Sequence, residues 1–140
     1  MSAYWVERGR LLAGPYPDAR LDQLRAAGVD FILDLTEEDE PLERYDGVLP
    51  GSVRRRRMPV RDFSCPAEED MTRILDAIDE ALGDGHTVYV HCRGGIGRTG
   101  TVSACYLVRH GATPEEALAR VQGPETDAQL ALVRSWRSLR

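Results

Sequence analysis

Cysteine, aromatic residues and long apolar runs are all scarce in this sequence. Three cysteines, Cys65, Cys92 and Cys105, occur among 140 residues. An odd number at irregular spacing is a poor disulfide framework, so we expect a reduced chain in the cytoplasm. No segment approaches the roughly 20 consecutive apolar residues that span a bilayer. The first eight residues lack the apolar core of a signal peptide, and we therefore expect no membrane association.

Positive charge is also in the minority. The chain has 18 basic residues, none of them lysine, against 23 acidic ones, and its formal net charge is -5. Broad nucleic-acid binding needs a basic surface, so no nucleic-acid partner is expected. The run Arg54–Arg57 is a local exception. It is typical either of a contact with nucleic acid or phosphoprotein, or of an edge strand with alternate arginines on opposite faces. The edge strand is favoured, and any further role stays open.

Length and composition indicate one domain that spans residues 1–140, and we expect a monomer. A chain of this length with 42% hydrophobic residues can bury its own core. Short apolar runs separated by glycine and proline predict strands. The predicted strands are 4–6 and 10–13, as a hairpin at a sheet edge, followed by 31–35, 53–60 and 88–90.

Helical patterns alternate with these strands and fill the last third of the chain. A short helix capped by Asp18 should end near Gly28, and Thr113–Glu116 is a capping box with proline at the first helical position. A last helix should begin near Pro124 and include Trp136. Another helix has an apolar stripe at helical spacing, made of Met71, Ile74, Leu75, Ile78 and Leu82. This order predicts an α/β domain, with a central, mostly parallel sheet flanked by helices and a helical C-terminal third.

The segment Val88–Gly100 carries the chemistry. Val88–Val90 predicts a buried strand, Arg93–Gly97 contains three glycines, and the apolar stretch that follows predicts a helix. Glycines let backbone N–H groups point at one centre, and a helix N-terminus adds unpaired N–H groups and positive potential. Together they predict a phosphate-sized anion site. The same field favours the thiolate of Cys92, while Arg98 can bind two phosphate oxygens, so Cys92 is a candidate nucleophile toward phosphorus.

The residues from His91 to Thr99 make the pattern His-Cys-x5-Arg-Thr. This pattern resembles the signature of cysteine-based protein tyrosine and dual-specificity phosphatases, and its Gly-Gly-x-Gly-Arg form is similar to compact members, bacterial relatives among them. The resemblance implies a phosphatase-like fold and metal-independent hydrolysis of phosphate monoesters through a phosphocysteine intermediate, with no cofactor. His91 would be structural. The phosphate would be bound by the loop N–H groups and one side chain, from Arg93, Gly94, Gly95, Ile96, Gly97 and Arg98.

The resemblance also implies a carboxylic acid on a nearby loop. Asp62 is followed by Pro66 four residues later, as in the family's acid loop, although Val60-Arg61 replaces the usual Trp-Pro. Asp62 would protonate the leaving hydroxyl and then act as base on water. Asp70 is a weaker candidate because it lies in a predicted helical turn.

Two further polar residues have candidate roles at this site. The Thr99 hydroxyl would donate to the Cys92 sulfur, cap the helix, or do both. Gln129 would orient the attacking water, as a glutamine near the C-terminal helix does in some family members, with Gln122 as the weaker candidate. Cys65 could form a reversible disulfide with Cys92, although an ordinary loop cysteine is favoured.

Other functions fit the sequence less well. Gly95–Gly100 matches G-x-G-x-x-G, but a dinucleotide site needs a second strand with an acidic residue, and helices follow instead. Zinc ligands at sensible spacing are lacking, so no metal is expected. A sulfurtransferase of the rhodanese type would not explain Arg98-Thr99, and a non-catalytic phosphate-binding module would have lost one of the key residues.

The substrate is the least defined feature. The long loop that recognises phosphotyrosine in larger family members is not evident, which favours dual specificity or a non-protein phosphate. A phosphorylated protein, with phosphotyrosine and then phosphoserine or phosphothreonine, is the first expectation. Phosphoinositides, nucleotides and RNA ends are alternatives, to which Arg93 could contribute positive charge. The acidic segment Thr36–Glu40 should border the same rim, where a solvated turn is favoured over a role at the site.

Overall fold

The computed structural model describes residues 3–17, 21–40, 45 and 52–138. Within them, five strands form one sheet in the order β1-β2-β5-β3-β4. The first two strands are an antiparallel hairpin at one edge, and the pairs from β2 to β4 are parallel. The strands are β1 (Tyr4–Glu7), β2 (Leu11–Gly14), β3 (Phe31–Asp34), β4 (Arg54–Arg57) and β5 (Val88–His91). The predicted sheet, with its edge hairpin, is confirmed.

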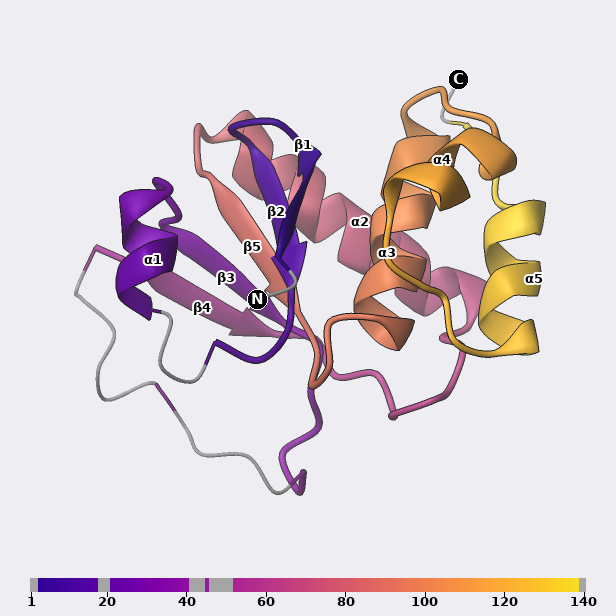
Figure 1. Ribbon diagram of the computed structural model, residues 1–140, viewed down its shortest axis with the longest axis horizontal. Helices are drawn as coiled ribbons and strands as arrows, with labels where there is room; N and C mark the ends of the chain where they lie inside the picture. The colour runs from indigo at the N-terminus through magenta and orange to yellow at the C-terminus, as the bar shows by residue number, and fades with distance from the viewer. Residues whose placement is uncertain (1–2, 18–20, 41–44, 46–51, 139–140) are drawn as a thin grey trace.

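Five helices flank the sheet (Figure 1). Alternate residues of β2 serve two separate cores: Leu11 lies in the larger core with α2 to α5, and Leu12 in a smaller one with Leu24 of α1. Because successive strand side chains point to opposite faces, α1 covers one face of the sheet and α2 and α3 cover the other. The helices are α1 (Leu21–Ala26), α2 (Glu68–Gly83), α3 (Gly97–Arg109), α4 (Pro114–Arg120) and α5 (Asp127–Ser135).

Sequence signals for the helix ends are confirmed at α4 but less accurate at α5. The Thr113 hydroxyl accepts from the Glu116 N–H at 3.1 Å, and the Glu116 carboxylate accepts from the Thr113 N–H at 2.8 Å. The α5 helix starts three residues after Pro124, with Thr126 as its N-cap, and ends before Trp136. The predicted cap at Asp18 lies outside the described residues. None of the described helices combines the length and apolar composition needed to cross a bilayer.

The predicted strand 53–60 is too long. Regular pairing stops at Arg57, because Pro59 has no N–H to offer the ladder. The residues on either side of Pro59 still run alongside the end of β3, because the Met58 and Val60 N–H groups donate to the Asp34 and Leu35 carbonyls at 2.9 Å each. This extension carries the chain to the carboxyl end of the sheet.

Three loops meet at that end. β3 and β5 finish level with each other, with Asp34 in register with His91. The loops that follow β3, β4 and β5 converge at the lower edge of the sheet in Figure 1. Ligands of α/β folds bind at the carboxyl ends of parallel strands, so the fold brings the candidate residues to one place.

Candidate active site

Cys92 lies at the floor of the loop between β5 and α3. Only 2% of the residue is exposed, and the Gly95 N–H donates to its sulfur at 3.3 Å. Gly95 has φ +79°, and a Cβ there would lie 2.5 Å from the Pro15 nitrogen. The segment after β2 is held against the loop, since the Tyr16 N–H donates to the Arg93 carbonyl at 3.1 Å. The predicted turn of backbone around the sulfur is therefore formed.

Arg98, in the first turn of α3, is 2% exposed. Its two terminal nitrogens bind both oxygens of the Glu40 carboxylate, at 2.7 and 3.0 Å. Nη1 also donates to the Val60 carbonyl at 2.9 Å, and Nη2 lies 3.3 Å from Oδ1 of Asp62. Nε is buried, and no described residue accepts from it. The guanidinium is thus held by one edge, which leaves the Nε side for a ligand.

The Glu40–Arg98 pair has a clear electrostatic signature. Burial alone would raise the pKa of Glu40, but the hydrogen bonds from Arg98 and from the Glu37 N–H outweigh it, with help from the charge of Arg93, and hold that pKa below its ordinary value. Burial likewise opposes the charge of Arg98, while Glu40 raises its pKa. Both groups therefore stay charged, and the arginine keeps one orientation.

Asp62 lies in a turn beyond β4 rather than at the end of a strand. Its Oδ1 accepts from the Phe63 N–H at 3.0 Å, and Ser64 donates to the Arg61 carbonyl through both its N–H and its hydroxyl. Phe63 has φ +61°, an uncommon conformation for a residue with a side chain. This tight turn directs the Asp62 carboxylate at Arg98, so the predicted acid reaches the site. Asp70, the weaker candidate, lies on α2 and pairs with Arg73.

His91 has the geometry of a structural residue. It is fully buried, its Nδ1 donates to the Cys92 carbonyl at 3.0 Å, and its Nε2 accepts from the Tyr45 hydroxyl at 2.5 Å. The carbonyl can only accept, so this pattern fixes the neutral tautomer with hydrogen on Nδ1. Burial lowers the pKa of His91, although Asp34, 3.7 Å away, opposes the shift.

Asp34 anchors the arginine-rich strand to this end of the sheet. Burial would raise the pKa of its carboxyl, but His91, two hydrogen bonds from Thr36 and the ion pair with Arg55 hold that pKa below its usual range. Arg57 lies 3.5 Å from the same carboxylate. Alternate arginines of β4 are therefore internal, as expected for an edge strand, and Arg54 and Arg56 are exposed.

Thr99 occupies neither predicted role. It is the third residue of α3, whose N-cap is Ile96. Its buried hydroxyl hydrogen-bonds none of the described residues, the Cys92 sulfur included. The N-cap interpretation is wrong because the helix starts three residues earlier than that role requires.

Gln129 is near the site but is not free. Its amide oxygen accepts from the Glu125 and Thr126 N–H groups at 2.9 and 3.2 Å, and its amide nitrogen donates to the Ser64 carbonyl at 3.0 Å. It is the third residue of α5 and closes the capping box that begins at Thr126. Gln122, the weaker candidate, is exposed.

Burial disfavours the charged thiolate form of the two remaining cysteines. Cys65 is half-buried, and burial raises the pKa of its thiol. Cys105 is fully buried in the core, where desolvation and then the neighbouring Cys65 raise its pKa above the ordinary value. All three cysteines are free in this structure, and a reversible disulfide between Cys65 and Cys92 stays a prediction.

Comparison with known proteins agrees with the geometry of the site. Residues 2–140 match the family model described as Swiss Army Knife protein, DSP-PTPase phosphatase domain. The chain belongs to the dual-specificity and tyrosine phosphatase family. The phosphatase domain is 30% identical over 135 residues to the phosphatidylglycerophosphate phosphatase PTPMT1 of Arabidopsis thaliana, across 91% of this chain and 38% of that protein.

Two further relatives extend the comparison. The tyrosine-protein phosphatase cdc-14 of Caenorhabditis elegans is 38% identical over 130 residues, which are 81% of this chain and 18% of that protein. The crystal structure of Tk-PTP in the active form has a TM-score of 0.82 at 30% identity, and the match covers 96% of this chain and 95% of that one. The phosphatase domain spans less than half the length of the curated relatives that it first matches.

Sequence reasoning missed one member of this phosphatase site. Glu40 was expected in a solvated turn, and that expectation is wrong, since its side chain is 10% exposed and binds Arg98 at both oxygens. The available signal was its place just beyond the carboxyl end of a strand beside the Cys92 strand. That position places Glu40 at the rim of the site. It does not show which acidic residue of the segment turns inward.

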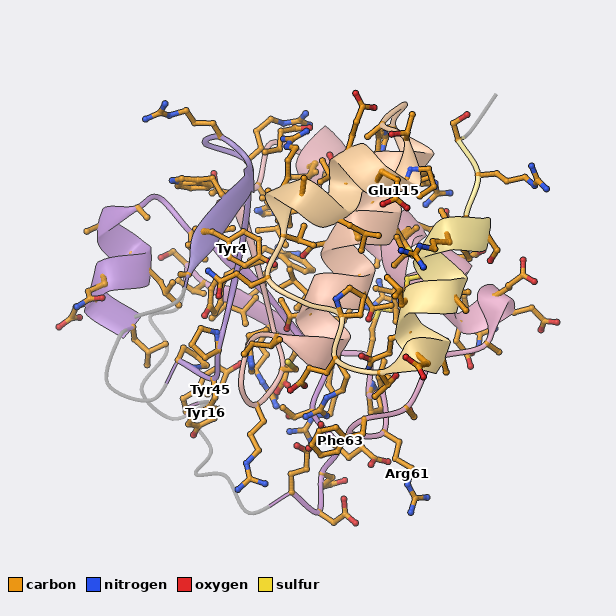
Figure 2. The ribbon with its side chains drawn as sticks, turned by 45° about the vertical axis from the view of Figure 1, so that its right-hand side comes forward. Tyr4, Tyr16, Tyr45, Arg61, Phe63 and Glu115 are labelled. Carbon is orange, nitrogen blue, oxygen red and sulfur yellow. The ribbon has the colours of Figure 1, made fainter. Side chains whose placement is uncertain are left out.

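The rim of the phosphatase site combines apolar and basic side chains. Phe63 and Ile96 are the large apolar residues with the greatest exposure among those described, at 64% and 40%. One is next to Asp62 and the other lies in the Cys92 loop. Arg61 and Arg93 are also exposed, and Figure 2 shows Arg61 and Phe63 together at the lower end of the molecule. A flat apolar group attached to an anion would suit this rim.

Proposed function

We propose that this domain hydrolyses phosphate monoesters through a phosphocysteine intermediate and acts on phosphotyrosine in proteins, with phosphoserine and phosphothreonine as slower substrates. One observation carries the proposal. Two segments bring three groups together: the buried Cys92 sulfur in a glycine loop, Arg98 at the end of the same loop, and Asp62 from the segment after β4, at 3.3 Å from Arg98. Nucleophile, charge stabiliser and acid are the three requirements of this chemistry.

The first step transfers the phosphoryl group to sulfur. The Cys92 thiolate attacks phosphorus, the bond from phosphorus to the ester oxygen breaks, and Asp62 gives its proton to the departing oxygen. Loop N–H groups and the free edge of Arg98 bind the phosphoryl oxygens as charge develops. Glu40 keeps that edge oriented through its two bonds to the opposite one.

The second step returns sulfur to its starting state. Water takes the place of the leaving group, gives a proton to the Asp62 carboxylate and attacks phosphorus. The bond between phosphorus and sulfur breaks, its electron pair returns to Cys92 as the thiolate, and inorganic phosphate leaves. These steps use protein groups alone.

The apolar rim supports an aromatic leaving group. Phe63, next to Asp62, and Ile96, in the Cys92 loop, offer exposed apolar surface, and an aromatic ring placed against them would bury it. The smaller alkyl groups of phosphoserine and phosphothreonine would bury less of this apolar surface. Arg61 and Arg93 would attract the anionic substrate.

A phospholipid headgroup is the second candidate, favoured by one comparison. A relative that matches 91% of this chain is named as a phosphatidylglycerophosphate phosphatase. The chemistry would be the same, with Arg61 and Arg93 facing a polyanionic surface instead of a peptide.

A phosphate-release panel tests the proposal. Phosphotyrosine, phosphoserine and phosphothreonine peptides and phosphatidylglycerophosphate vesicles are incubated with the protein, with reductant and a metal chelator. We expect fastest release from phosphotyrosine and complete loss in Cys92→Ser. The matched control Cys65→Ser should keep wild-type rates. Release confined to lipid would move the substrate class, and release that survives Cys92→Ser would reject the mechanism.

A further inference from the structure

The arginine-rich strand β4 borders a groove that lies outside the phosphatase site. Two cavities, of about 380 and 210 Å³, lie end to end between β4 and α2 and share Arg56. Residues 56–59 line the larger cavity on one side, and Asp70, Arg73 and Ile74 line it on the other. The smaller cavity continues along the same two elements, away from the start of α2. We call the two cavities together the β4–α2 groove.

The larger cavity of this groove is basic. Arg56 is exposed and forms no ion pair with any described residue, in contrast to Arg55 and Arg57, which pair with Asp34. Arg73 is exposed and pairs within its own helix. Three arginines and one carboxylate therefore line this cavity. In a protein of net charge -5, such a local excess of positive charge favours an anionic ligand.

The strand side of the groove also offers backbone groups. The Met58 N–H donates to the Asp34 carbonyl at 2.9 Å, and Arg54 bonds the β3 side in the same way. Successive backbone groups of a strand point in alternate directions, so the N–H and carbonyl of Arg57 point away from β3. Neither bonds a described residue. An extended peptide beside β4 can pair with them, as in the addition of a strand to a sheet edge.

The β4–α2 groove opens close to the phosphatase site. Arg57 is in register with Asp34, and Asp34 with His91, so β4 and β5 are two strand spacings apart, about 10 Å. Pro59 lines the groove, and the next carbonyl along the chain holds Arg98. An extended chain covers about 10 Å in about three residues. A protein that reaches the Cys92 loop can therefore place a nearby segment in the groove.

We propose that the β4–α2 groove docks an acidic, extended segment of a protein. Carboxylates of the segment pair with Arg56 and Arg73, and its backbone bonds the outward groups of Arg57. That this protein is the phosphorylated substrate rests on the proposed function. The docked segment then lies a few residues from the phosphorylated side chain, and it adds affinity without taking part in the chemistry.

The carboxylates along the groove favour a peptide over a nucleic acid. Asp70 lines the larger cavity, and Glu80 and Asp84 line the smaller one. A nucleic-acid backbone has a negative charge at every nucleotide, so it would face these carboxylates along the whole groove. A peptide can place its acidic side chains opposite the arginines alone.

Fluorescence anisotropy of a short labelled peptide tests the binding itself. The peptide alternates glutamate with threonine, and excess inorganic phosphate keeps the Cys92 loop from competing for it. We expect saturable binding that weakens with salt. Affinity should fall about 5-fold or more in Arg56→Glu and in Arg73→Glu, because an attraction becomes a repulsion. Arg8→Glu is the matched control, since Arg8 is exposed in the β1–β2 hairpin at the other edge of the sheet.

Reversing the charge of the peptide gives a second reading. A lysine–threonine peptide should bind Arg56→Glu more tightly than it binds the wild type. Equal losses in Arg56→Glu and Arg8→Glu would overturn the proposal, and so would equal affinity of a glutamine–threonine peptide. A single-stranded oligonucleotide that binds more tightly than the glutamate peptide, and through Arg56, would overturn it in favour of nucleic acid.

Steady-state kinetics show whether the docked protein is the substrate. With p-nitrophenyl phosphate, Arg56→Glu should match the wild type, because this substrate is too small to reach the groove. With a phosphotyrosine peptide that has glutamates on both sides, KM should rise about 5-fold or more while kcat stays unchanged. An unchanged KM would overturn docking of the substrate. Failure of the proposed function looks different: no release would depend on Cys92, while the glutamate peptide would still bind.

Discussion

Glu40 shows how much one unforeseen side chain decides at the residue scale. Its carboxylate makes two bonds to Arg98. In Glu40→Gln, an amide NH2 group replaces one carboxylate oxygen, and it cannot accept from the Arg98 N–H that it faces. Hydrogen bonds to charged groups contribute about 1.5–3 kcal/mol, so we expect kcat/KM for p-nitrophenyl phosphate to fall by about 10- to 100-fold. Steady-state kinetics measure this.

The neighbouring Asp39 provides the control for that experiment. It is exposed on the same acidic segment, so Asp39→Asn changes the local charge equally without touching Arg98. The two variants should therefore differ. Equal effects would mean that Glu40 acts only through the net charge of the rim, and the role as holder of Arg98 would be lost.

At the scale of elements, the loop between β5 and α3 is built around one glycine conformation. A methyl group on Gly95 would meet the Gly14–Pro15 backbone at 2.5–2.6 Å, and φ there is +79°. Gly94, next to it, has nothing within 4 Å of such a group. We expect Gly95→Ala to lower the free energy of unfolding by about 1–3 kcal/mol and to reduce kcat, because the N–H that bonds to Cys92 must move. Gly94→Ala should do neither. Urea unfolding and steady-state rates are the measurements, and similar losses in both variants would contradict the argument.

The sequence was most informative about the individual helices and strands. Apolar periodicity and the capping box at Thr113 are local signals, and the helices and strands they predict are present. The Cys92 loop is local too, since nucleophile, glycines and Arg98 lie within seven consecutive residues. Glu40 reaches Arg98 from 58 residues away, and Tyr45 reaches His91, at the end of the strand before this loop, from 46 residues away. Such pairings depend on which strands become neighbours, and periodicity does not record that.

The predicted ends of a strand and a helix were wrong where two local sequence signals competed. Pro59 ended the pairing of a strand that its apolar neighbours continued. At α5, Thr126 and Gln129 form a capping box that starts the helix after Pro124. The same box engages the amide oxygen of Gln129, whose role in orienting water stays a prediction. A residue type can thus be found from sequence while its hydrogen-bond partners cannot.

For the molecule as a whole, the buried His91 links stability to pH. Unfolded His91 takes up a proton near its ordinary pKa of about 6.5, whereas the folded residue, with its pKa lowered by burial, takes it up only at lower pH. The unfolded state therefore binds more protons as pH falls from about 7 to about 5, and the free energy of unfolding should fall by up to about 1.4 kcal/mol per pH unit. Asp34, whose pKa is also lowered, contributes stability that is lost only below this window.

Urea unfolding at several pH values checks this, with His91→Gln as the comparison. The variant keeps a donor and an acceptor near Tyr45 but cannot titrate, so its slope should be shallower than that of the wild type. His86 and His110 pair with acidic residues on the surface, and their effects are common to both proteins. Identical slopes would show that His91 is not the titrating group.

The arginine-rich strand also has a consequence for folded chains at high concentration. β4 ends the sheet in the described part of the protein, and Arg54 and Arg56 are exposed on it. If a second copy aligned its own β4 there, the backbones would lie about 5 Å apart, and two rows of guanidinium groups would repel each other. Edge strands are where sheets extend into aggregates. Here the charge on the edge guards against that, while the inward arginines hold the same strand to Asp34.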